Sequence, residues 1–268
     1  MIHLKNYTSF FKMNESISVE KLDSASYENE TVTSLPYNNL IEDNRQAFLK
    51  KIIRVAKDIG VKPIWLMHVI FNESEFDPKK VDRITKAVGL LSFLPSVIRS
   101  FVNTETGKNY TPNDVLQMTN TEQLDLVRAF YKSWIDHMKI KKPIAAGDFA
   151  ALTFYPGVIK KDWDWDFPTF VIERNPDLFK SFASENSKTK KDYYEYADQI
   201  LNSEKAYDST NNYLLGNFSG AIAEPNTYGN KKPLEFYKDL LLSLENPVLS
   251  QQINSQDSEN TEKSKQIG

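Results

Sequence analysis

One short segment constrains this chain more than any other. Residues 63–72 read Pro-Ile-Trp-Leu-Met-His-Val-Ile-Phe-Asn, and the next residue is a glutamate, Glu73. A proline suits the first turn of a helix, and a helix that is apolar nearly all round belongs in a core. We therefore expect Glu73 at the exit of a buried helix, where a carboxylate is costly unless it has a partner or a task. The alternative is a Glu73 that caps the helix or forms a salt bridge at the surface, as most charged residues do.

The rest of the chain also has mostly helical periodicity. Few segments alternate between polar and apolar residues as strands do, so we predict a mainly α fold. Gly60 suits the left-handed end of the first helix, and Thr111 followed by Pro112 marks the start of another. We predict helices over residues 41–59, 63–73, 95–102, 121–138, 147–155, 190–203 and 233–244, and looser structure over most of 74–94, 162–188 and 204–232.

These elements divide the chain into four expected parts. They are an irregular N-terminal arm over residues 1–40, a helical domain over 41–185, a helical C-terminal extension over 186–249 and a disordered polar tail over 250–268. Aromatic residues of the arm could dock it onto the domain; these are Tyr7, Phe10 and Phe11. Two alternatives stay open for residues 186–249, which either form a separate domain or complete the core of the first.

Composition excludes several classes of function. The net charge of −3 provides no general basic field, so we expect no nucleic-acid partner. The absence of cysteine excludes disulfides and thiolate metal sites. His68 and His137 lie far apart in the sequence without a second ligand at metal-binding spacing, so we expect no metal site, and no cofactor is indicated.

The chain also lacks recognisable membrane signals. The N-terminus has no unbroken apolar stretch typical of a signal peptide, and no apolar run reaches the roughly 18 residues of a membrane span. We therefore expect a soluble protein without a transmembrane segment, which another system would have to deliver if it acts outside the cytoplasm.

Three blocks of sequence carry a resemblance to a known family. Residues 73–78 read Glu-Ser-Glu-Phe-Asp-Pro, residues 89–95 read Gly-Leu-Leu-Ser-Phe-Leu-Pro, and residues 151–157 read Ala-Leu-Thr-Phe-Tyr-Pro-Gly. In this order the blocks resemble the catalytic core of soluble lytic transglycosylases, relatives of goose-type lysozyme in the lysozyme-like superfamily. The resemblance covers residues 45–160, and the Phe-Tyr-Pro form of the third block is similar to lysozyme-like modules of some bacteriophages.

The blocks also depart from the family pattern at three positions. Glu75 stands where the family usually has glycine, Ser92 where it has glutamine, and Pro156 where it has asparagine. Ser92 is too short to make the amide contacts to a sugar that glutamine makes. These departures put the activity, more than the fold, in doubt.

The resemblance implies a lysozyme-like helical domain that cleaves the MurNAc–GlcNAc β-1,4 glycosidic bond of peptidoglycan. It assigns Glu73 as the general acid/base, a role that suits a carboxyl whose pKa is raised by desolvation. It places Tyr155 beside that residue, with a partly buried structural tyrosine as the alternative. A lytic transglycosylase needs no second carboxylate, whereas an inverting hydrolase would, and Glu75, Asp77 and Asp82 are then the candidates.

Four further residues are candidates for sugar contacts. Ser74 and Ser92 offer hydroxyl groups, although Ser74 could equally bond to local backbone. Phe93 belongs to the second block, and Trp163 could stack on a sugar ring or simply pack against its neighbours.

Two hypotheses about function follow. The first is a peptidoglycan-cleaving enzyme, a lytic transglycosylase or lysozyme, that acts at the cell wall or periplasm and is carried there by a phage particle, as a virion component, or by a secretion machine. The second is a catalytically weak lysozyme-like component that binds the cell wall or has a structural role in such an assembly. The glycan strands of peptidoglycan are the expected partner in the first case.

Overall fold

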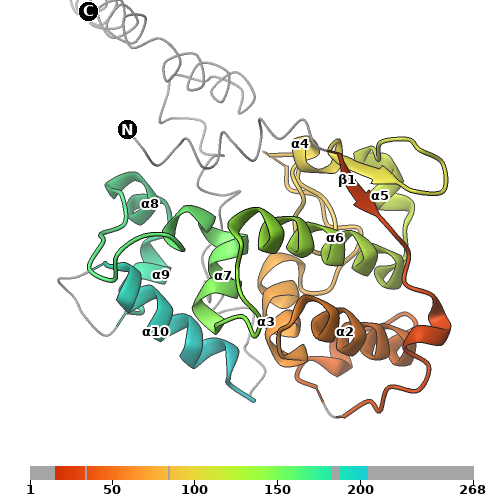
Figure 1. Cartoon of the computed structure of the whole chain (residues 1–268), viewed down its shortest axis with the longest axis horizontal. Coiled ribbons are helices and arrows are strands. Elements are labelled where there is room, and N and C mark those ends of the chain that lie inside the picture. The colour runs from red at the N-terminus through yellow and green to blue at the C-terminus, as the bar shows by residue number, and fades with distance from the viewer. Residues whose placement is uncertain (1–15, 34, 84, 183–187, 205–268) are drawn as a thin grey trace, which may run out of the picture.

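The computed structural model describes residues 16–33, 35–83, 85–182 and 188–204, which fold mainly as α-helices with a short two-stranded sheet (Figure 1). The prediction of a mainly α fold is confirmed. In chain order the elements are β1 (Ile17–Val19), the 3-10 helices η1 (Ser24–Ser26) and η2 (Asn38–Leu40), α2 (Arg45–Ile59), α3 (Pro63–Ser74), α4 (Pro95–Ile98), β2 (Phe101–Asn103), α5 (Pro112–Gln117), α6 (Asn120–Met138), α7 (Ala146–Phe154), the 3-10 helix η3 (Pro156–Val158), α8 (Thr169–Arg174), α9 (Pro176–Lys180) and α10 (Lys190–Leu201).

Helix α3 is at the centre of this arrangement. It lies between α2 on one side and the pair α7 and α10 on the other, while α6 runs along α2 (Figure 1). Nine of its twelve residues are buried, because α3 is apolar nearly all round and has a neighbour on each side. The predicted core helix over residues 63–73 is therefore confirmed.

Local signals in the sequence set most helix ends. Gly60 ends α2 in the left-handed conformation with φ of 87°, and Pro63 opens α3 at its first position. Thr111, Thr119 and Thr189 begin α5, α6 and α10, each with a capping box in which the threonine and an acidic residue three positions later satisfy backbone N–H groups.

The region around the small sheet differs from the prediction. The helix predicted over 95–102 is wrong in its second half, because α4 ends at Ile98 and β2 follows. Strand β2 pairs in parallel with β1, with Ile17 opposite Phe101. A helix that continued to residue 102 would make this pairing impossible. Part of the segment that we assigned to the N-terminal arm is thus packed on the domain, and Val19 and Tyr37 are buried in its core.

The C-terminal half of the described chain is more ordered than predicted. Two short helices, α8 and α9, lie in the segment over 162–188 that we predicted to be looser, and Pro176 begins the second of them. Helix α10, from the predicted C-terminal extension, packs on α7 and α3 and contributes to the same core. The predicted helix over 233–244, the tail over 250–268 and the arm residues Tyr7, Phe10 and Phe11 lie outside the described residues.

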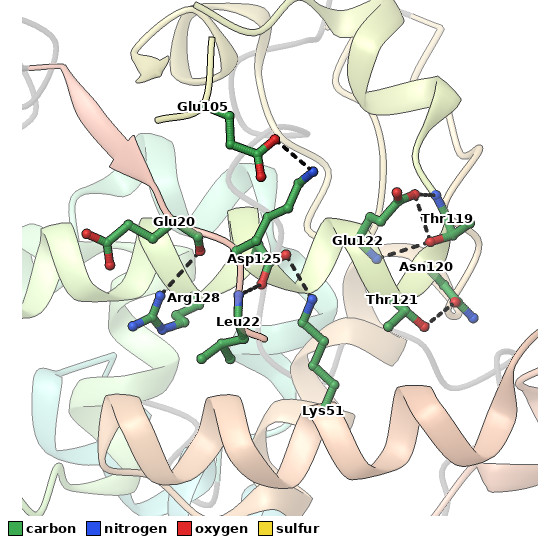
Figure 2. Close-up of polar contacts among 11 residues, drawn as sticks. Glu20, Leu22, Lys51, Glu105, Thr119, Asn120, Thr121, Glu122, Asp125 and Arg128 are labelled. Atoms are coloured by element: carbon green, nitrogen blue, oxygen red, sulfur yellow. Dashed lines mark hydrogen bonds and ion pairs between the residues drawn. The ribbon is translucent and has the colours of Figure 1, made fainter. Parts of the chain in front are cut away.

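A buried ion pair ties the N-terminal segment to the core helices. Lys51 on α2 and Asp125 on α6 are 3% and 5% exposed, and Lys51 Nζ lies 2.8 Å from Asp125 Oδ2 (Figure 2). The other oxygen of Asp125 accepts a hydrogen bond of 3.1 Å from the backbone N–H of Leu22. Asp125 therefore holds two helices and the chain that follows β1 together.

No helix within the described ranges combines the length and the apolar character that crossing a membrane requires.

Candidate active site

Glu73 lies in the last turn of α3 and is buried, with 6% of its surface exposed. Burial is the main reason that the pKa of its carboxyl is raised to about 7, because the charged form loses solvation. The positive charge of Lys80 and hydrogen bonding from the Asn72 side chain lower the pKa and offset part of this effect. The carboxyl therefore titrates near neutral pH, which suits a group that donates a proton and takes it back.

The loop that follows Glu73 turns sharply through residues in the left-handed conformation. Glu75 caps α3 with φ of 55°, and Phe76 follows with φ of 66°. Glycine adopts positive φ without steric cost, so the backbone conformation at residue 75 would suit glycine better than glutamate. Further on, Ser92 also has a positive φ, of 46°.

Gln123 on α6 fastens the first two sequence blocks together. Its side chain is fully buried, and Oε1 accepts a hydrogen bond of 2.9 Å from the backbone N–H of Leu90. Its Nε2 donates to the carbonyl oxygens of Pro78, at 2.7 Å, and Val115, at 2.9 Å. Because Pro78 ends the first block and Leu90 is the second residue of the second block, this one amide fixes both sides of the loop after Glu73.

Gly89 completes this connection. A Cβ atom at residue 89 would lie 2.4 Å from Gln123 Oε1, and the residue has φ of 77°. Both the close approach and the backbone conformation therefore require glycine at the start of the second block. Gln123 was not predicted as a site residue, although an amide on the apolar stripe of the helix over 121–138 is the kind of buried polar group that needs partners.

Ser92 lies beside Glu73, and the two other candidates from the first two blocks point into the protein. The Ser92 hydroxyl donates a hydrogen bond of 2.9 Å to the backbone carbonyl oxygen of Glu73. Ser74 is buried and its hydroxyl donates to the carbonyl of Ile70, one turn back in α3. Phe93 is buried with its ring edge-to-face with the rings of Phe101 and Phe130, at 5.4 and 5.8 Å.

Tyr155 directly follows the C-terminus of α7 and is buried. Its ring stacks on Trp165 with centroids 6.2 Å apart, and it meets Phe167 edge-on at 5.9 Å. Burial raises the pKa of its phenol to about 12, so the hydroxyl keeps its proton at neutral pH and can donate a hydrogen bond.

Tyr131 of α6 connects the ends of α3 and α7. Its hydroxyl shares a hydrogen bond of 2.6 Å with the hydroxyl of Thr153, two residues before Tyr155. Burial raises the pKa of Tyr131 most, and the negative charge of Glu73 raises it further. Burial is also the main reason that the pKa of Tyr193 on α10 is raised, and the charge of Glu73 adds to this effect. The charge of Glu73 therefore acts on two buried tyrosines, Tyr131 on α6 and Tyr193 on α10.

The three candidates for a second carboxylate lie in the loop after Glu73, where two of them bond to nearby residues of the same loop. The Asp77 carboxylate accepts a hydrogen bond from the backbone N–H of Lys79, and Asp82 accepts two from Thr85, one from its backbone and one from its hydroxyl. The side chain of Glu75 is exposed. Asp77 and Asp82 thus shape the loop after Glu73.

Trp163 is on the surface, with 58% of its area exposed. It lies on a turn in which the backbone N–H of Trp165 donates to the carbonyl of Asp162 at 3.2 Å. The structure therefore gives Trp163 and Trp165 different positions, since the first faces solvent and the second stacks on Tyr155.

His68 is a core residue with both ring nitrogens bonded. Nε2 lies 2.8 Å from the carbonyl oxygen of Ser203, which can only accept, so this nitrogen carries the proton. Nδ1 then accepts from the Tyr37 hydroxyl at 2.8 Å. Burial lowers the pKa of the imidazole. Among the described residues, no group of three or more histidine and acidic side chains is arranged to hold a metal ion.

Comparison of the chain with protein families, with curated proteins and with solved structures gave no match. The resemblance to lytic transglycosylases and goose-type lysozymes therefore rests on the three sequence blocks.

Proposed function

We propose that the protein cleaves peptidoglycan as a lytic transglycosylase or lysozyme, with Glu73 as its general acid/base. The observation that carries this proposal is the buried Glu73 carboxyl, whose pKa lies near 7 at the end of an apolar helix. The order of the three sequence blocks supports the choice of substrate, the MurNAc–GlcNAc glycosidic bond of the glycan strand.

In the proposed reaction Glu73 first gives its proton to the glycosidic oxygen as the bond from this oxygen to C1 of the muramic residue breaks. The resulting carboxylate then takes the proton of the muramic 6-hydroxyl while that oxygen bonds to C1 and closes an anhydro ring. The glutamic acid is regenerated, and neither water nor a second carboxylate is consumed. The protonated hydroxyl of Tyr155 is the candidate donor that steadies the reacting sugar.

Digestion of purified peptidoglycan tests this function. The wild type, Glu73→Gln and the control Glu195→Gln, which changes an exposed acid on α10, are compared by mass spectrometry of the released sugars. Anhydro-muropeptides from the wild type and the control, but not from Glu73→Gln, would establish a transglycosylase. Products with reducing ends would identify a hydrolase, in which Glu75, Asp77 and Asp82 become candidates for activating water.

A second candidate function is a cell-wall-binding or structural component with weak catalysis. The observations that favour it are the low exposure of Glu73 and the hydroxyl of Ser92, which bonds to the backbone of Glu73 where the family has a longer amide. Retention on peptidoglycan without release of sugars, from walls of several bacteria, would favour this function. Action at the cell wall or periplasm, and carriage by a phage particle or secretion machine, belong to both proposals.

A further inference from the structure

Trp163 is the most exposed of the large apolar side chains among the described residues, with 58% of its surface accessible. Phe170, with 44%, is the other aromatic residue in that group. A single exposed apolar side chain needs no explanation by itself. The contacts that hold this indole ring at the surface are specific, however, and they are described next.

The first of these contacts is a buried lysine. Lys190 is only 6% exposed, and its Nζ lies 4.8 Å from the centroid of the Trp163 ring. The same nitrogen donates hydrogen bonds to the carbonyl oxygens of Ile159 and Lys161, at 2.8 and 2.9 Å. The ammonium group is therefore fixed in place and occupies one side of the indole.

The second contact is Tyr194 of α10, which meets the Trp163 ring edge-to-face at 5.2 Å. Its hydroxyl donates a hydrogen bond of 2.7 Å to Asp148. Its ring covers Gly147 so closely that a Cβ atom there would lie 2.2 Å from it. Backbone bonding adds to this support, because the N–H of Lys191 donates to the carbonyl of Trp163 at 3.0 Å. Trp163 is thus exposed and also rigidly supported.

The position of Trp163 connects it to the candidate active site. It is two residues from Trp165, so their Cα atoms are at most about 7 Å apart. Trp165 in turn stacks on Tyr155. Trp163 therefore lies close along the chain to a ring that packs on Tyr155, and its own ring packs on Tyr194.

We propose that Trp163 is an outer saccharide-binding platform that holds the glycan strand beyond the bond to be cleaved. This inference rests on the proposed function and names a subsite for it. The free face of the indole suits the C–H groups of a pyranose ring, and the exposed carboxylates of Asp162 and Asp164 can accept hydrogen bonds from sugar hydroxyl and amide groups.

The charges around the platform favour a neutral sugar over other ligands of aromatic rings. The Lys190 ammonium already lies over the indole ring and occupies the place that a cationic ligand would take on that face. Three exposed carboxylates alternate with the tryptophans, at Asp162, Asp164 and Asp166, and they repel the phosphates of a nucleic acid.

Binding of a soluble β-1,4-linked N-acetylglucosamine tetramer tests the platform without catalysis. The Glu73→Gln protein is compared with the same protein carrying Trp163→Ala, Trp163→Phe or Phe170→Ala, by calorimetry and by acrylamide quenching of tryptophan fluorescence. We expect Trp163→Ala to weaken binding about tenfold, which corresponds to about 1.4 kcal/mol, and Trp163→Phe to weaken it less. Phe170→Ala should bind normally, and the sugar should protect Trp163 from the quencher.

Normal binding by Trp163→Ala, equal loss in Phe170→Ala or absence of binding by all four proteins would overturn the platform. Its failure is distinguishable from failure of the proposed function. If binding depends on Trp163 but the protein releases no sugars from peptidoglycan, the platform is supported and the proposed enzymatic function is contradicted. Cleavage that depends on Glu73 but proceeds with unchanged KM and unchanged binding in Trp163→Ala would support the proposed enzymatic function and contradict the platform.

Discussion

Two buried carboxylates in this protein have opposite surroundings. Asp125 on α6 is paired with the equally buried Lys51 and accepts a hydrogen bond from the backbone of Leu22 (Figure 2). Glu73 on α3 is just as buried, yet Lys80 acts on it only through its charge, without an ion pair among the described residues. A partner of opposite charge offsets much of the cost of burying a charge, whereas a buried carboxyl that is left largely unpaired takes up a proton instead.

Both acids are buried, so burial does not distinguish them. The presence or absence of an oppositely charged partner distinguishes the structural acid from the functional one more clearly. Asp125 contributes to holding α2, α6 and the N-terminal segment together. Glu73 has a pKa of about 7, which lowers the stability of the protein at neutral pH and provides a proton for chemistry. Mutating the two acids should therefore have opposite consequences for activity and stability.

The largest expected effect is on activity. Replacement of Glu73 with glutamine removes the transferable proton while keeping the shape of the side chain. We expect the rate of sugar release from peptidoglycan to fall by about 10²–10⁴-fold, the usual contribution of a general acid/base. Initial rates of turbidity loss measure this, with Glu195→Gln as the control. If the Glu73→Gln variant kept more than a tenth of the wild-type rate, Glu73 would not be the general acid/base.

The second largest expected effect is a loss of stability when Asp125 is mutated. Asp125→Ala leaves the Lys51 ammonium buried without its partner, and we expect a loss of about 3–5 kcal/mol in the free energy of unfolding. The double variant Lys51→Met, Asp125→Leu should recover most of this, because no buried charge remains. Urea unfolding measures both. As a control, Glu105→Gln breaks the exposed pair with Lys21 and should cost less than about 1 kcal/mol. An equally small loss in Asp125→Ala would mean that Lys51 reaches solvent or another partner.

The pH dependence of stability distinguishes the two acids by sign. Because the folded pKa of Glu73 is raised from 4.5 to about 7, the native state binds the proton more tightly than the unfolded state does. The stabilising contribution is complete below pH 4.5 and is lost as the pH rises through 7, a loss of about 3 kcal/mol. Glu73→Gln should therefore become progressively more stable than the wild type between pH 4.5 and 8.

Comparison with the variant isolates this effect from that of His68. The pKa of His68 is lowered, so it contributes in the opposite direction, with stability lost as the pH falls below 6.5. This term is present in both proteins and cancels in their difference. Urea unfolding at several pH values gives that difference, and a constant value from pH 4.5 to 8 would contradict a raised pKa for Glu73.

The sequence predicted the position of Glu73 but not the groups that act on it. The apolar run over 63–72 and Pro63 define the helix, so the exit of Glu73 from a buried segment follows directly from neighbouring residues. Gln123 and Tyr131 are some fifty residues further on, and only packing of α6 against the loop and α7 brings them there. The three-residue strands β1 and β2 were missed because such short segments contain too few alternating positions to reveal a period.

A smaller effect concerns the pH profile of activity. A general acid must be protonated, so kcat/KM should decrease as the pH rises through about 7. Lys80 lowers the pKa of Glu73 by favouring its charged form. Lys80→Met should therefore raise this pKa, by less than about one unit, and shift the falling limb of the profile to higher pH. A shift to lower pH, or a profile unchanged within error, would show that Lys80 does not act on Glu73. Lys86→Met, at an exposed lysine on the same loop, is the control.

The smallest expected effect tests the backbone beside Glu73. Glu75 is exposed and ends α3 with φ of 55°, a conformation that costs about 1 kcal/mol for a residue with a Cβ atom. Glycine removes this cost, but its greater conformational freedom in the unfolded chain offsets part of the gain in stability. We expect Glu75→Gly to raise the free energy of unfolding by about 0.5 kcal/mol, measured with urea. Gly89→Ala, at a position with φ of 77° and with Gln123 Oε1 in the space of the new atom, should have the opposite sign and a larger size. A loss of stability in Glu75→Gly would mean that the glutamate side chain contributes more than its backbone strain costs, and that the departure from glycine beside the proposed catalytic acid has a function of its own.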